Sequence, residues 1–313
     1  MKPVLAPVRA ALSHHVFIHP GMVRTATSTL QRHVFTNHHE IFYLGLPAPS
    51  DELHWAVTHV CQADSVHLEP DRLHDVFEAA IGAASHDQKV MISYENFAFC
   101  KSKDKGLIAE RLHALFPQAS ILFTIRRQED LVVSRYLTDL RKLVKLRSFI
   151  EFEDWYWFGY REAYRHIFDD LYYNEIISYY IDLFGKSQVH VHLFEQLKED
   201  AAAFSAGFAG SLGVSPSEFH ELLGQRRDNA AMTRAYYQFW RHFGHLLPRR
   251  IVRKLSRRTD HRSGKPARVE VSAEIRAHLA SIYSDGNTRL MTTVKIDLAR
   301  HGYCLPGTEK NAP

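Results

Sequence analysis

One segment of the chain gathers small, hydroxylated and basic side chains between a strand-like run and a helix-like run. It reads HHVFIHPGMVRTATSTLQRHVF over residues 14–35, with apolar residues at 16–18, a break at Pro20 and Gly21, and apolar residues at helical spacing from Thr27 onward. A loop that enters a helix in this way directs backbone N–H groups and the positive end of the helix dipole at one point. The segment therefore predicts an anion-binding loop. The polar side chains expected around the anion are Arg24, Thr25, Thr27, Ser28 and Thr29.

A second segment, SILFTIRRQEDLVVSRYLTDLRKL at residues 120–143, predicts another phosphate contact. An apolar run ends at Arg126 and Arg127, and Ser134 follows Arg126 by eight residues on a predicted helix. An arginine at the carboxyl end of a parallel strand lies at the mouth of the sheet, where open α/β folds bind ligands. A serine on the following helix can contact the same phosphate. The pair Arg126 and Ser134 is therefore a candidate phosphate site.

Two residues are candidates for a general base. Glu95 in KVMISYENF comes directly after a predicted strand at 89–93, so its carboxylate is expected at the ligand edge of the sheet. His54, expected in a loop, is the second candidate because histidine titrates near neutrality. The 21 histidines show no His-Glu-x-x-His or comparable ligand spacing, and no metal site is predicted.

These residues need a parallel sheet to bring them together, and the chain has the pattern of one. Apolar strand-like runs at 16–18, 89–93 and 121–125 alternate with helix-like segments at 71–84 and 106–116. Such alternation is typical of an α/β domain.

The first segment resembles a known nucleotide loop. The ATP-binding P-loop needs Gly-x-x-x-x-Gly-Lys, and here Ala26 and Thr27 follow Gly21 and its four residues instead, so an ATPase is disfavoured. Residues 23–31 resemble the 5′-phosphosulfate loop of sulfotransferases that use PAPS (3′-phosphoadenosine 5′-phosphosulfate), which often reads Pro-Lys-Thr-Gly-Thr-Thr-Ser-Leu-Gln. Arg24 stands in place of lysine and Ala26 in place of glycine. The similarity continues at Arg126 and Ser134, which match the family's 3′-phosphate pair. It is also present at 194–197, 211–214, 226–232 and in the tail at 284–303, so that it runs through nearly the whole chain.

The resemblance implies a fold, a donor and a reaction. The fold is α/β, a three-layer sandwich with a central, mostly parallel sheet of the P-loop nucleoside-triphosphatase-like sulfotransferase kind. The reaction transfers a sulfuryl group from PAPS to a hydroxyl or amine of a carbohydrate, glycolipid or small metabolite, without a metal, and releases adenosine 3′,5′-bisphosphate. Catalysis would involve Glu95, Arg24 and His54. In cytosolic members the strand ends in Lys-Thr-His, matched here by Ser93, Tyr94 and Glu95, and other branches use glutamate as the base. The residues expected to bind PAPS are Arg24, Thr25, Ala26, Thr27, Ser28, Thr29, Arg126 and Ser134.

Three other functions stay open at this point. A phosphotransferase on a similar scaffold is disfavoured by the missing Gly-Lys pair. A catalytically degenerate nucleotide-binding protein is suggested by Arg24 and Ala26. A nucleic-acid module on the basic run at 248–268 is disfavoured because the formal net charge is only +4 and no recognised motif is present.

Composition indicates a globular cytoplasmic enzyme. The 313 residues, 45% of them hydrophobic, predict a single domain over 1–313, with a core at about 14–215 and a helical and basic lid region at about 216–313. No run approaches the roughly 18–20 apolar residues that span a membrane, and three scattered cysteines indicate a reducing compartment. The basic run at 248–268 is a candidate nucleotide lid and a candidate for peripheral membrane contact. Its candidate phosphate contacts are Arg257, Arg258, Arg262 and Lys265.

Overall fold

The computed structural model describes residues 14–98, 104–145, 149–163, 165–224, 232–243 and 265–307. The chain divides into two compact units. The first combines Met1–Arg126, Tyr172–Arg226 and Gly286–His301, and the second combines Arg127–Leu171, Arg227–Asp285 and Gly302–Pro313. The single domain expected from the sequence stays a prediction.

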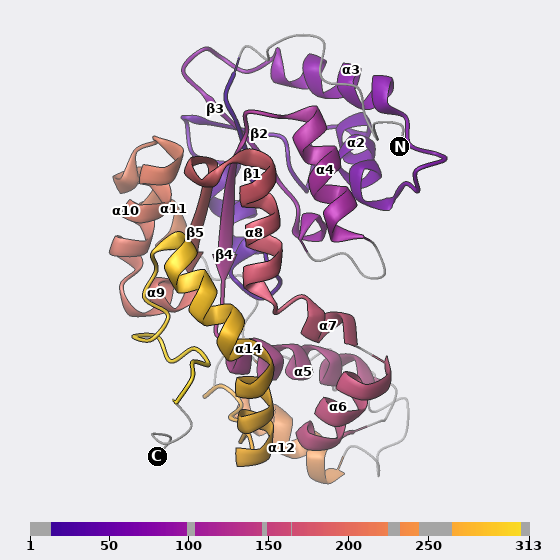
Figure 1. Cartoon of the computed structure of the whole chain (residues 1–313), viewed down its shortest axis with the longest axis vertical. Coiled ribbons are helices and arrows are strands. Elements are labelled where there is room, and N and C mark those ends of the chain that lie inside the picture. The colour runs from indigo at the N-terminus through magenta and orange to yellow at the C-terminus, as the bar shows by residue number, and fades with distance from the viewer. Residues whose placement is uncertain are drawn as a thin grey trace. The chain divides into compact units, whose positions relative to one another are not determined.

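The first unit is built on a five-stranded sheet in which every pairing is parallel. The strand order is β2-β3-β1-β4-β5 (Figure 1). All carboxyl ends of the strands therefore lie at one edge, which is the edge where ligands bind in open α/β folds. The strands are β1 Val16–His19, β2 Ile41–Tyr43, β3 Lys89–Ser93, β4 Ser120–Ile125 and β5 Val189–Leu193.

Helices cover both faces of this sheet. Because side chains alternate along a strand, Phe17, Met91 and Leu122 face one side and form a buried cluster with η1, α10 and α11. Phe123 faces the other side and its ring meets that of Tyr180 on α8 at 5.1 Å, edge to face. The unit is thus a three-layer α/β sandwich (Figure 1), as the sequence predicts. Its helices are α1 Thr27–Thr29, η1 Leu30–Phe35, α2 Asp51–Gln62, α3 Pro70–Ile81, η2 Glu95–Phe97, α4 Lys105–Leu115, α8 Tyr173–Phe184, η4 Lys186–Gln188, α9 Phe194–Glu199, α10 Ala201–Leu212 and α11 Pro216–Gly224.

Side-chain caps explain where several of these helices begin. Asp104 accepts a hydrogen bond from the Leu107 N–H at 3.1 Å at the start of α4, and Asp200 accepts one from Ala203 at 2.9 Å at the start of α10. Such caps stabilise a helix end because they satisfy N–H groups that have no partner within the helix.

The second unit is helical in its described residues and is rich in buried aromatic rings. Tyr136 donates to the Ile150 carbonyl at 2.8 Å, and Tyr283 donates to the Phe168 carbonyl at 2.8 Å. Trp155 and Trp240 are also buried, so most rings of this aromatic region serve packing. Its helices are α5 Gln128–Lys145, α6 Phe152–Phe158, η3 Gly159–Ala163, α7 Arg165–Asp169, α12 Arg234–Phe243 and the first part of α14 Ala273–Val294, which ends in the first unit.

Three residues of the predicted lid, Arg257, Arg258 and Arg262, lie outside the described residues. Lys265 is exposed, and its carbonyl accepts the Arg234 N–H at 2.8 Å. In the part of the chain that the structure describes, no helix is long and apolar enough to cross a membrane.

Candidate functional site

The loop between β1 and α1 has an unusual backbone. Gly21, Arg24 and Ala26 adopt φ values of 56°, 65° and 63°, which lie in the left-handed region. Exposure alternates along the loop, because Arg24, Ala26 and Ser28 are partly exposed while the threonines between them are buried. The left-handed turns therefore present one row of residues outward. Ala26 adopts this conformation although it has a Cβ, which glycine would lack.

The buried threonines stabilise the loop from inside. The Thr25 and Thr27 hydroxyls both donate to the Met22 carbonyl, at 2.6 and 3.0 Å. The sequence suggested these hydroxyls as donors for an anion, but both are occupied within the loop. The Ser28 hydroxyl has no hydrogen-bond partner among the described residues, so it is the side-chain donor that this row offers.

Arg126 connects the end of β4 to this loop. Its Nη1 donates to the Arg24 carbonyl at 3.0 Å, and its guanidinium lies 4.8 Å from the centre of the Phe194 ring. Lys198 lies 4.9 Å from the same ring centre, so Phe194 contacts two cations. Tyr173 donates to the Arg126 carbonyl at 2.6 Å and fixes the backbone here. The Arg126 guanidinium therefore contacts the backbone of the loop at Arg24.

The neighbouring arginine has a different role. In the second unit, Arg127 donates to the Asp130 carboxylate at 3.0 Å in the first turn of α5. This ion pair distinguishes Arg127 from Arg126, which contacts the loop.

Glu95 lies at the carboxyl edge of the sheet, as the first residue of η2 directly after β3 and Tyr94. Burial raises the pKa of its carboxyl, and the nearby Arg24 charge opposes this rise. The Glu95 carboxyl therefore lies within electrostatic range of Arg24.

A hydrogen-bonded group beneath the loop was not expected from the sequence. His19 Nδ1 and the Ser93 hydroxyl lie 2.8 Å apart, and Gln31 Nε2 donates to the same hydroxyl at 3.0 Å. Burial and the neighbouring His192 lower the pKa of His19 to about 3, so its ring is neutral at neutral pH. This group connects the ends of β1 and β3 to η1. His19, Ser93 and Gln31 come together only when β1 and β3 pair in register.

Two further predicted site residues lie on helices. His54, expected in a loop, lies in the first turn of α2 and is exposed. The helix begins there because the Ser50 hydroxyl accepts from Leu53 at 3.2 Å and Asp51 and Glu52 favour a first turn. Ser134 is half-buried on α5 in the second unit, and its role stays a prediction.

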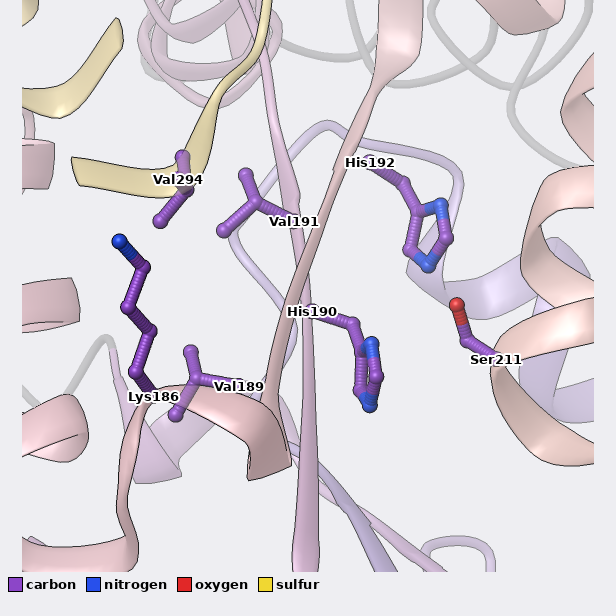
Figure 2. Close-up of a pocket in the computed structure, with 7 residues that line it drawn as sticks. All are labelled: Lys186, Val189, His190, Val191, His192, Ser211 and Val294. Atoms are coloured by element: carbon purple, nitrogen blue, oxygen red, sulfur yellow. The ribbon is translucent and has the colours of Figure 1, made fainter. Parts of the chain in front are cut away.

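A groove of about 240 Å³ runs along β5, the last strand of the sheet order. Figure 2 shows His190 and His192 on the side of Ser211, and Val189 and Val191 on the side of Lys186 and Val294. Burial lowers the pKa of His190, and burial together with His190 lowers that of His192 to about 3. None of the residues predicted to bind the donor lines this groove.

One solved structure resembles the chain over most of its length. A sulfotransferase from Alicyclobacillus acidocaldarius matches with a TM-score of 0.55 and 17% identity, over 92% of this chain and 98% of that one. The chain has the sulfotransferase fold. This agreement confirms the α/β sandwich that the sequence predicts.

Two further sulfotransferase structures also resemble the chain. A sulfotransferase domain from the curacin biosynthetic pathway has a TM-score of 0.47 and 14% identity, over 92% of this chain and 100% of that one. A sulfotransferase domain from the Synechococcus PCC 7002 olefin synthase has a TM-score of 0.42 and 13% identity, over 84% and 98%. No protein-family model and no curated protein sequence matches the chain.

Proposed function

We propose that the protein transfers a sulfuryl group from PAPS to a hydroxyl or amine of a small acceptor. One observation carries this proposal. Arg24, Arg126 and Glu95 lie near one loop, at the ligand edge of the sheet, in a chain with the sulfotransferase fold. A donor with several phosphate and sulfate charges needs cations and N–H groups, and an acceptor hydroxyl needs a base. This edge of the sheet offers both.

The loop residues fit the 5′-phosphosulfate end of the donor. Arg24, the Ser28 hydroxyl and the backbone N–H groups of the outward row supply charge and donors. The carbonyl of Arg24 is bonded to Arg126, so the loop and the proposed 3′-phosphate contact form one connected structure. The assignment of Ser134 to the 3′-phosphate rests on its sequence spacing from Arg126 alone.

Glu95 is the proposed general base. Its carboxylate takes the proton of the acceptor hydroxyl as the acceptor oxygen forms a bond to sulfur. The bond between sulfur and the bridging phosphate oxygen breaks at the same time, and adenosine 3′,5′-bisphosphate leaves with the negative charge. Arg24 and the loop N–H groups stabilise that charge. A base with a raised pKa is a stronger proton acceptor, which suits this role. His54 is less well supported because it is exposed on α2.

Calorimetry with adenosine 3′,5′-bisphosphate tests the donor site, with adenosine 5′-monophosphate as the matched ligand that lacks the 3′-phosphate. Tighter binding of the bisphosphate supports the proposal, and equal affinities contradict it. A screen of carbohydrate, glycolipid and small-metabolite acceptors with ³⁵S-labelled PAPS then tests transfer.

The same experiments distinguish the other functions. Bisphosphate binding without transfer to any acceptor would indicate a nucleotide-binding protein, which the Ala26 methyl group in the outward row of the loop favours. Mg²⁺-dependent ATP consumption would indicate a phosphotransferase.

A further inference from the structure

Three metal-ligating side chains converge at the opposite end of the first unit's sheet. His38 and His39 lie in the turn that leads into the amino end of β2, and Glu218 lies in the first turn of α11. One ligand atom from each residue lies within 4.8 Å of the others. The chain segments involved are separated by 179 residues in sequence.

The buried histidine is oriented as a metal ligand would be. The side chain of His38 has an exposed fraction of 0%, and its Nε2 lies 3.1 Å from the Ser215 carbonyl oxygen. A carbonyl can only accept, so Nε2 carries the proton, and in the neutral ring the lone pair is on Nδ1. That Nδ1 lies 3.8 Å from Glu218 Oε2 and accepts only a long bond, 3.3 Å, from the Glu40 N–H. A hydrogen bond from the second ring nitrogen to a carbonyl is the usual support of a metal-binding imidazole.

The other two ligands face the same point. Glu218 Oε1 accepts the His39 N–H at 3.0 Å, which leaves Oε2 to contact His39 Nδ1 in a short hydrogen bond. The His39 ring is 72% exposed and can rotate, whereas the buried His38 ring is fixed.

We propose that His38 Nδ1, His39 Nδ1 and Glu218 Oε2 bind a divalent transition metal ion, Zn²⁺, with water as the fourth ligand. Imidazole and carboxylate ligands suit zinc, and tetrahedral bonds of 2.0–2.1 Å place ligand atoms about 3.3 Å apart. The 3.8 Å distance from His38 to Glu218 is close to this value. Rotation of the exposed His39 ring replaces its hydrogen bond to Glu218 by a bond to the metal. The ion then cross-links the turn before β2 to α11.

This site is separate from the proposed sulfuryl transfer. It lies at the amino end of β2, whereas Glu95 and Arg126 follow the carboxyl ends of β3 and β4. Zinc is therefore expected to stabilise the first unit without taking part in the reaction.

Zinc titration of the untagged full chain tests the proposal. The chain is stripped of metal with a chelator, and ZnCl₂ binding is measured by calorimetry, with Co²⁺ absorption as a report of tetrahedral geometry. Glu218→Gln and His39→Ala are the test variants. Asp64→Asn is the matched control, because Asp64 pairs with His67 at 2.9 Å and no third metal-ligating side chain joins this pair among the described residues.

We expect one tight zinc ion per chain and a tetrahedral Co²⁺ spectrum in the unaltered protein and in Asp64→Asn. Both test variants should lower the affinity for this ion by about 100-fold or more, since even a supporting residue outside the coordination sphere contributes about 10- to 100-fold to metal affinity. Zinc should also raise the melting temperature of the unaltered chain but not of Glu218→Gln. Equal affinity in the control and both variants, or no tight site in the unaltered chain, would overturn the proposal. Metal-free melting curves of the variants verify that each is folded, and the exposed His39 gives a second test if Glu218→Gln unfolds.

Discussion

Replacement of Arg126 by alanine tests the donor site most directly. The Arg126 guanidinium contacts the loop through the Arg24 carbonyl at 3.0 Å and lies over Phe194. The variant removes one positive charge from the ligand edge and releases the loop carbonyl from its partner. Both changes should weaken binding of adenosine 3′,5′-bisphosphate.

The size of the effect follows from the kind of contact. A hydrogen bond to a charged group contributes about 1.5–3 kcal/mol, and about 1.4 kcal/mol corresponds to a tenfold change in Kd. We therefore expect Arg126→Ala to raise the Kd of the bisphosphate by about 10- to 150-fold. Arg126→Lys retains the charge but loses the planar fork that binds phosphate through two N–H groups. Its Kd should therefore lie between those of the unaltered protein and Arg126→Ala.

Calorimetry at fixed ionic strength measures these affinities, and Arg127→Ala is the matched control. Arg127 is the adjacent residue, and its half-buried side chain pairs with Asp130 and not with the loop, so its loss should change the Kd much less than the loss of Arg126. The reasoning is refuted if Arg126→Ala binds as tightly as the unaltered protein. It is also refuted if Arg127→Ala loses as much affinity, because the effect would then report general charge.

Variants at three further positions, Glu95, Gly45 and Ala26, give additional tests. Glu95→Gln should lower kcat by about 100- to 10,000-fold in a labelled-PAPS assay and leave bisphosphate affinity unchanged; normal turnover would exclude Glu95 as the base. The pKa of Glu95 is raised in the folded protein, so the folded protein loses stability as the pH rises through that pKa and the buried carboxyl loses its proton. Glutamine stays neutral, so Glu95→Gln should have a higher melting temperature than the unaltered protein at pH 7 and a similar one near pH 4. An alanine Cβ at Gly45 would lie 2.4 Å from the Ser93 carbonyl oxygen, so Gly45→Ala should lose about 1–3 kcal/mol or more in urea unfolding. Gly207→Ala, with open space around its Cβ, should gain about 0.5–1 kcal/mol, and similar curves for both would contradict the model of a tight approach at Gly45. Ala26→Val should lower the free energy of unfolding, because a branched side chain tolerates φ 63° less well than alanine. Ala26→Gly should change that free energy by no more than about 1 kcal/mol. Equal free energies of unfolding for both variants would show that this turn holds little strain.

Strong local signals explain what the sequence predicted. β3 begins and ends at 89 and 93 as predicted, since an apolar run this short, with β-branched Val90 and Ile92, favours a strand over a helix. β1 and β4 are each one residue longer than their predicted runs. Arg24 and Arg126 are predicted as candidate site residues from their residue type and position: Arg24 lies in the loop after a strand, and Arg126 lies at the end of one.

Short elements and long-range contacts explain what it missed. β2 has three residues, Ile41–Tyr43, too few to show a periodicity, and α2 follows a proline-rich stretch that reads as a loop. The contacts of Ser93 with His19 and Gln31 depend on sheet register, which is fixed only when the strands pair. The occupation of the Thr25 hydroxyl depends on left-handed turns at Arg24 and Ala26, which no local preference of these residues predicts.

Two buried, neutral imidazoles affect how the protein's pH dependence can be interpreted. His19, beneath the loop, and His192, on β5, both have a pKa of about 3, far below the range in which histidine usually gains its charge. Acidification from pH 8 to pH 5 therefore leaves both rings uncharged. A change in turnover over that range has to come from other groups, and Glu95, whose pKa is raised by burial, is one of them.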